Sequence, residues 1–172
     1  MKTLAEVMIG ETFNVADIEF IKFTDEGGKV CAVAKDRLFT SLFGDNNDFS
    51  KSMLLKKLEN EVLFKIEAAV GAENVFEFET DLTSLCGSDL YGSIKSKISL
   101  ATLDFYRKHV KIFDKYKLDR WWWLATPEST NEHYNDQWFL CVSPSGDIIF
   151  NFSVFNCGVR PFLIFNSSIS VS

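Results

Sequence analysis

The chain has 172 residues, of which 47% are hydrophobic and 15% aromatic, and it carries a net charge of -6 with a pI near 5.0. This length suits one domain with a sizeable core, and the composition excludes a disordered chain. The acidic balance argues against a phosphate-binding surface, which clustered Lys and Arg usually mark, so we expect no direct nucleic-acid ligand. No apolar run reaches the roughly 20 residues that span a bilayer, so we expect no membrane insertion.

The N-terminal segment MKTLAEVMIGETF carries acidic and polar residues where a secretory signal needs an unbroken apolar stretch. We therefore expect a protein of a host or bacterial cytoplasm, and later incorporation into a virion is compatible with the same segment. Four cysteines, at positions 31, 86, 141 and 157, form no C-x-x-C pair. In a reducing compartment we expect them to be buried thiols.

The first predicted element is a hairpin within residues 18–34. IEFIKFT and KVCAVA alternate as strands do, and the connecting DEGG contains Gly27 and Gly28, which tolerate the positive φ of a tight turn. Because apolar residues fall on both faces of its first strand, we expect that strand to be covered on both sides.

A helix is predicted within SKSMLLKKLENEVLFKIEAAVG, residues 50–71. Ser50 or Ser52 can cap its start, and Gly71 can end it. The helix presents one apolar stripe, made of Leu54, Leu58, Val62 and Ile66 and widened by Met53, Leu55, Leu63 and Val70.

The stretch VFEFETDL, residues 75–82, predicts a strand with an apolar face and a wet face of carboxylates. A second helix is predicted in SLATLDFYRKHVKIF, with Ser99 as its cap and Leu103, Tyr106 and Val110 at helical spacing. We expect His109 to lie on the surface of that helix.

The C-terminal third predicts a sheet, because the runs WWWLAT, QWFLCVS, DIIFNFSVF and GVRPFLIF are aromatic and β-branched and are separated by turn residues. The expected fold class is α+β, with antiparallel sheets and two helices in a single domain. Residues 1–118 would supply a hairpin and helices, and residues 119–172 would be rich in strands.

Three segments form an ordered signature: DRWWWLATPES at 119–129, FLCVSPSGDI at 139–148 and CGVRPFLIF at 157–165. The signature resembles a phage and Firmicutes domain family of unknown function that is typified by a W-W-L-R-S-P segment and a closing G-V-R-P. An opening GETFNVADIEFIKF strand, a helix from Ser52 to Asn60 and a KISLATLDFYRK segment match the same layout. Ala125 and Thr126 stand where that family has Arg and Ser, so no role of that arginine is transferred.

The resemblance implies a C-type-lectin-like domain related to formylglycine-generating enzymes, a fold that also serves phage binding proteins diversified by retroelements. It implies a rigid scaffold with a tolerant ligand-binding surface near the C-terminus. The signature residues also have structural interpretations. We expect at most one of the three tryptophans to be exposed, and we expect Arg160 to hold an internal carboxylate or carbonyl.

STNEHYNDQW and FNFSVFN, between the fixed segments, are the candidate recognition surface. They also fit ordinary polar loops and a strand, and some of their phenylalanines can belong to the core. If they bind a ligand, rigid aromatic side chains would anchor it and polar ones would supply adaptable hydrogen bonds. The candidate anchors are Tyr134, Trp138, Phe150, Phe152 and Phe155, and the candidate polar residues are Asn131, His133, Asn135, Asp136 and Asn156.

Catalytic motifs are missing from the sequence. His109 and His133 lack metal-ligand spacing, and no nucleophile elbow, P-loop or dinucleotide fingerprint occurs, so we expect no metal and no cofactor. Cys141 and Cys157 can meet across strands, but nothing near them predicts a lowered thiol pKa.

The sequence therefore favours a non-enzymatic ligand-binding module of phage or prophage origin that recognises a protein or a cell-surface glycan. An intracellular anti-defence or regulatory protein that blocks a host protein is the alternative. A redox enzyme that works through Cys141 and Cys157 is the third hypothesis.

Overall fold

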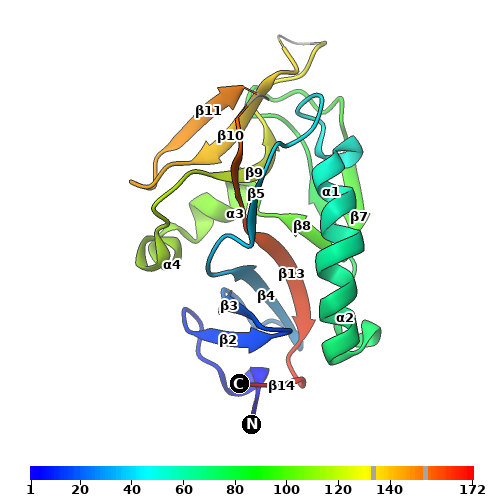
Figure 1. The fold of residues 1–172 in the computed structure, drawn as a ribbon, viewed down its shortest axis with the longest axis vertical. Coiled ribbons are helices and arrows are strands. Elements are labelled where there is room, and N and C mark those ends of the chain that lie inside the picture. Colours follow the sequence, from blue (N-terminus) through cyan, green and yellow to red (C-terminus); the bar gives the residue numbers. More distant parts are fainter. Residues whose placement is uncertain (133–134, 153–154) are drawn as a thin grey trace.

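The computed structural model describes residues 1–132, 135–152 and 155–172. The fold is α+β and its sheets are built mainly from antiparallel pairs, which confirms the predicted class. In Figure 1 the paired chain termini lie at the bottom of the long axis, and the hairpin of strands β10 and β11 lies near its top. The candidate surface and the termini are therefore at opposite ends of the molecule.

One sheet is formed mostly by N-terminal strands, in the order β2-β3-β4-β13-β8. Its strands are β2 Thr12–Val15, β3 Ile18–Lys22, β4 Lys29–Ala34, β13 Pro161–Asn166 and β8 Ile98–Leu100. The predicted hairpin is β3 and β4, with Gly27 at φ 59° and Gly28 at φ 78° in its turn. Phe20 and Ile21 are both buried, so β3 is covered on both faces as expected.

The opening segment GETFNVADIEFIKF is two strands, so the continuous strand expected from the resemblance is wrong. Antiparallel pairing brings Val15 opposite Ile18, which leaves a two-residue turn. Ala16 at φ 51° and Asp17 at φ 62° both adopt the left-handed conformation of that turn. Neither residue is glycine, so this segment carries no Asn-Gly or Asp-Gly turn motif.

The predicted first helix is present from Met53 to Val70. It consists of α1 Met53–Lys57, a π-helical segment Leu58–Leu63 and α2 Phe64–Val70. The Leu55 amide donates to Ser52 Oγ at 3.0 Å, so Ser52 is the cap, and Gly71 ends the helix at φ 88°. Its buried stripe packs into the core, but Met53 is 67% exposed, and its predicted place in the stripe is wrong.

The second helix begins later than expected. Thr102 caps α3 Leu103–Lys108, and α4 Val110–Phe113 follows. Ser99, the predicted cap, instead lies in strand β8, where its buried hydroxyl accepts a hydrogen bond from Thr80 at 3.1 Å. Val110, which follows the interruption of the helix at His109, is 38% exposed.

The other five-stranded sheet contains the C-terminal signature, in the order β11-β10-β9-β12-β5. Its strands are β11 Ile148–Phe152, β10 Trp138–Val142, β9 Trp122–Pro127, β12 Cys157–Val159 and β5 Phe39–Ser41. Trp122 and Trp123 are buried on opposite faces of β9, whereas Trp121 precedes the strand and is 41% exposed. One of the three indoles thus reaches solvent.

Two apolar cores lie on opposite sides of these sheets. One core contains Trp123 and the stripe of the helix from Met53 to Val70, and the other contains Trp122 and side chains of α3 and α4. The remaining elements are short: β1 Lys2–Thr3 paired with β14 Ser170–Val171, β6 Phe78–Asp81 paired with β7 Ser93–Ser96, and 3-10 turns at Leu4–Glu6, Phe49–Lys51, Ala72–Asn74 and Asp114–Tyr116.

No helix in the described part of the chain has both the length and the apolar character needed to cross a bilayer.

Candidate functional site

An exposed aromatic cluster lies on the β10–β11 hairpin. The antiparallel register places Trp138 opposite Phe152 and Leu140 opposite Phe150, so these side chains share one face. The rings of Trp138 and Phe150 stack with centroids 4.8 Å apart and planes 13° apart, and Phe152 meets the indole edge-on at 6.0 Å. Phe150 is 56% exposed and Phe152 is 52% exposed. Phe150 and Phe152 therefore face solvent while they pack against the half-buried Trp138.

This face of the sheet is buried farther along. Leu140 and Val142, which follow Trp138 on the same face of β10, belong to the core that α3 and α4 cover. The cover ends before the outer part of the hairpin, so Phe150 and Phe152 project beyond it. The sequence alone could not tell which face of β11 is inward; the structure places Ile149 and the buried Asn151 on the inner face.

The other candidate residues are distributed around this hairpin. Asn131 is exposed in the loop before β10, and Asn135 and Asp136 are half-buried at the end of that loop. Phe155 and Asn156 are exposed just before β12 and line a pocket on the other side of the hairpin from the aromatic cluster. Two further candidates, His133 and Tyr134, lie outside the described residues.

Asn135 and Asp136 are partly engaged within their own loop. The Gln137 backbone amide donates to Asn135 Oδ1 at 2.7 Å, and the Gln137 side chain donates to Asp136 Oδ1 at 3.0 Å. Ser129 Oγ donates to the Asn135 carbonyl at 2.8 Å. These hydrogen bonds shape the loop, so the two side chains have less freedom to contact a ligand than Asn131 or Asn156.

Asn47 holds this loop to the body of the protein and is fully buried. Its Nδ2 donates to the carbonyls of Ser129 and Trp138, both at 2.9 Å, and its Oδ1 accepts from the Tyr91 hydroxyl at 2.7 Å. Its segment, GDNND at residues 44–48, has the composition of an ordinary polar loop. Nothing local in the pair Asn46–Asn47 indicates that Asn47 is buried. Its hydrogen-bond partner Ser129 lies 82 residues farther along the chain.

The contact with Asn47 places the Tyr91 hydroxyl in surroundings that shift its pKa. Burial, with the nearby carboxylates of Asp136 and Asp48, raises the pKa of Tyr91 to about 12. The phenol is thus held in its neutral, donating form, which is the form that the hydrogen bond to Asn47 requires.

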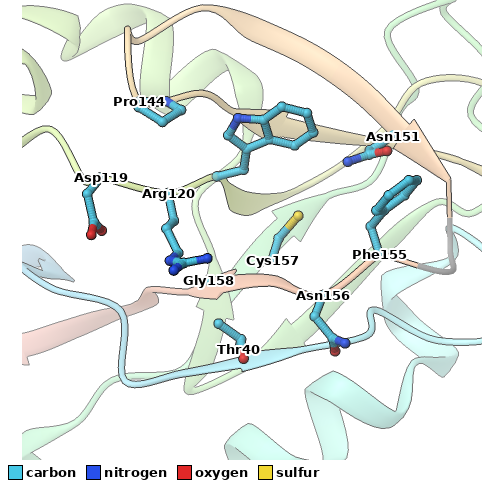
Figure 2. A pocket seen from close by; sticks show the side chains of 10 residues that line it. Thr40, Asp119, Arg120, Pro144, Asn151, Phe155, Asn156, Cys157 and Gly158 are labelled. Atoms are coloured by element: carbon cyan, nitrogen blue, oxygen red, sulfur yellow. The ribbon is translucent and has the colours of Figure 1, made fainter.

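A pocket of about 410 Å³ opens between the start of β9, the end of β11 and the start of β12. Figure 2 shows the side chains of Asn151, Phe155, Cys157 and Thr40 around it. The lining residues are Thr40, Asp119, Arg120, Trp121, Pro144, Asn151, Phe155, Asn156, Cys157 and Gly158.

All four cysteines are free thiols, and Cys141 and Cys157 are buried. A hydrogen bond from Cys157 and burial raise the pKa of the Cys141 thiol. The two thiols come from strands β10 and β12, which lie on either side of β9, and they are close enough to share this hydrogen bond. A raised thiol pKa disfavours the reactive thiolate.

Cys86 is exposed, so the prediction of a buried thiol is wrong there. It lies in a turn beside Glu128, and partial desolvation together with that carboxylate raises the pKa of the Cys86 thiol. Cys31 is half-buried, and burial raises the pKa of its thiol.

His109 is half-buried rather than on the helix surface, so that expectation is wrong. Its ring lies 4.5 Å from the Phe105 ring and 5.5 Å from the Phe23 ring, at the break between α3 and α4. Burial lowers the pKa of His109 and favours the neutral ring. Within the described residues, no group of three His, Cys, Asp or Glu side chains is arranged to hold a metal ion.

Arg160 is buried in the interior, where its Nε donates to the Ala34 carbonyl at 2.8 Å. This contact confirms the predicted internal carbonyl. The guanidinium lies over the rings of Trp122 and Phe113, at 4.7 and 5.5 Å, and burial lowers its pKa to about 10. Arg160 is therefore part of the scaffold behind the candidate surface.

Comparison of the chain with protein-family models, with curated proteins and with solved structures finds no match.

Proposed function

We propose that this protein is a non-enzymatic ligand-binding module whose recognition surface is the outer face of the β10–β11 hairpin with its adjoining loops. The observation that carries the proposal is the solvent-facing cluster of Trp138, Phe150 and Phe152. Rings that are already stacked lose little conformational entropy when a partner covers them, and stacked aromatics are frequent anchors of interfaces.

The position of the cluster supports the same reading. β11 is an edge strand, so the hairpin is open to solvent along one side, while β10 is anchored between β9 and β11. A partner could cover the rings and contact the loop that contains Asn131 without disturbing either core. The scaffold beneath, with Asn47 tied to the loop, keeps the surface in one arrangement.

A protein or a cell-surface glycan is the proposed partner class, since aromatic rings flanked by Asn side chains suit both. We propose a C-type-lectin-like scaffold of phage or prophage origin, in line with the signature at 119–165, with a C-terminal surface that a retroelement diversifies. A near-copy repeat and a reverse transcriptase beside the gene would support diversification, and their absence would remove that part of the proposal.

Binding of the labelled protein to intact candidate host cells tests the function. The double variant Phe150→Ser/Phe152→Ser should lose most of the cell-bound signal, because it removes two of the three rings. Phe64→Ser is the matched control, since Phe64 is 70% exposed on α2 and lies outside the hairpin. Equal binding by the double variant and the control would refute the hairpin as the recognition surface.

The alternative function gives a different result in the same system. A protein that blocks a host protein should not bind intact cells and should capture one intracellular protein from lysate. That capture should depend on Phe150 and Phe152. That outcome would replace the cell-surface partner and retain the recognition surface.

A further inference from the structure

We propose that the pocket lined by Trp121, Asn151 and Phe155 binds a pyranose ring that carries a carboxylate, such as a uronic acid or a sialic acid residue of a glycan. This inference rests on the proposed function, because it assumes binding without catalysis, and it assigns the pocket a ligand class. The volume of about 410 Å³ lies at the lower end of the roughly 300–1,000 Å³ of small-molecule sites.

Asn151 supplies the first reason for a ligand. Asn151 is 8% exposed, and its buried Nδ2 has no hydrogen-bond partner among the residues that the structure describes. The orientation of the amide is fixed, since the Phe152 backbone amide donates to Asn151 Oδ1 at 3.1 Å. Asn151 lines the pocket, and Figure 2 shows its amide among the other lining side chains. An unpaired buried donor is costly, so the pocket favours a ligand with an acceptor oxygen at this point.

Two aromatic rings supply the second reason. Trp121 is 41% exposed and Phe155 is 48% exposed, and both line the pocket. The face of an aromatic ring is electron-rich and attracts the weakly positive C–H groups of a sugar ring. A pyranose has such a C–H face and a rim of hydroxyls, which matches a pocket with aromatic walls and the polar side chains of Thr40 and Asn156 at its edge.

Arg120 supplies the charge. It lines the pocket and is exposed, and it makes no ion pair or hydrogen bond with any described residue. Asp119, the carboxylate beside it, is paired with Arg37 at 3.4 Å. One unpaired guanidinium suits one carboxylate, with which it can form two parallel hydrogen bonds. A phosphate group, with more charge, would call for additional cations that the described lining does not offer.

The wall behind the ligand is rigid because β9 and β12 approach closely. The Gly158 amide donates to the Trp121 carbonyl at 2.7 Å, and a Cβ added to Gly158 would lie 3.2 Å from that oxygen and 3.1 Å from Arg37 Cβ. The backbone of Trp121 is thereby fixed, which restricts where its indole can lie. This preorganisation favours binding by a small ligand.

The test is an NMR titration of the full chain with D-glucuronic acid, with N-acetylneuraminic acid and with glucose as the neutral counterpart. We expect shifts at the Asn151 side-chain amide and the Trp121 indole, and an affinity for at least one acid about tenfold higher than for glucose. The acid that binds more tightly distinguishes a uronic from a sialic source. Arg120→Gln should abolish the preference, while Arg107→Gln, at an exposed cation on α3, should not.

Three results would overturn the assignment. These are no shift at Asn151 or Trp121 with either acid, equal affinity for glucose and the acids, or tighter binding of a short peptide with a free C-terminal carboxylate. Folding of each variant is checked from the rest of its spectrum. If Phe150→Ser/Phe152→Ser abolishes cell binding while the pocket fails to titrate, only this inference fails. If the pocket binds a sugar acid but the double variant binds cells as well as the wild type does, the hairpin proposal fails instead.

Discussion

At the scale of single residues, the amide of Asn47 links three parts of the chain that are far apart in the sequence. It bonds to the Ser129 and Trp138 carbonyls on one side and to the Tyr91 hydroxyl on the other. A buried side chain that uses both its donor and its acceptor groups stabilises one loop conformation, because any other arrangement would leave polar atoms without partners.

Replacing this amide tests its importance. Asn47→Ala should lower the free energy of unfolding by about 2 kcal/mol, since the Ser129 carbonyl and the Tyr91 hydroxyl lose their present partner. Urea unfolding measures the change. Asn131→Ala, at an exposed position, should stay within about 0.5 kcal/mol of the wild type. Similar values for both variants would contradict the role of Asn47.

The hydroxyl of Tyr91 makes stability depend on pH in the alkaline range. Its pKa is about 12 in the folded protein and about 10 in an unfolded chain, so the folded state holds the proton more tightly. This contribution to stability is fully present below pH 10 and is lost as the pH rises towards 12. Tyr91→Phe should start from a lower stability but lose less between pH 10 and 12, which urea unfolding across that range measures. Parallel curves for the two proteins would disprove the linkage.

At the scale of elements, the sequence predicted those helices, strands and turns that are determined by residues close together in the chain. The glycines at 27 and 28, the stripe between Met53 and Val70 and the aromatic strands after residue 121 were all predicted, because turn chemistry and periodicity act over a few residues. The cap of α3 was misplaced because Ser99 and Thr102 are equally good local caps. Only the pairing of β8 with β13 decides between them.

Sequence prediction of the candidate site also stops where tertiary packing decides. Alternation along a strand puts Phe150 and Phe152 of β11 on the same face, and the observed register agrees. Which face is inward depends on where α3 and α4 stop covering the sheet, and this is a tertiary property. The buried Asn151 and the fixed Trp121 were likewise not identified as site residues, since no local pattern reveals a pocket made by three separate strands.

The turn between β2 and β3 is a weak point that substitution can improve. Ala16 and Asp17 occupy left-handed conformations that cost non-glycine residues roughly 1–2 kcal/mol each, whereas Asn-Gly is the preferred pair for such a turn. Ala16→Asn/Asp17→Gly should therefore raise the free energy of unfolding by about 1 kcal/mol, measured by urea titration. Asp17→Val should lower it. A destabilised Asn-Gly variant would show that the turn has another requirement.

At the scale of the whole molecule, the two large sheets are joined covalently and by packing. The chain passes from β12 in one sheet to β13 in the other at Arg160, which is buried. Each core contains side chains from both sheets, such as Phe20 with Trp123 in one and Ile21 with Trp122 in the other. Neither sheet can lose its partner without exposing both cores.

We therefore expect one cooperative unfolding transition, as the single-domain prediction requires. Tryptophan fluorescence reports mainly on the sheet with β9, where Trp122 and Trp123 lie, while far-UV circular dichroism reports on the whole chain. Their urea midpoints should coincide. Two separated midpoints would mean that the sheets unfold as independent units.

The pairing of β1 with β14 brings Lys2–Thr3 beside Ser170–Val171, at the end of the molecule away from the hairpin (Figure 1). This arrangement makes the protein suitable for circular permutation, because a short linker can join the ends and the chain can be reopened at the exposed turn of Gly27 and Gly28. It also means that a carrier fused at either end would display the aromatic face outward, so multivalent presentation on a particle needs no redesign of the recognition surface.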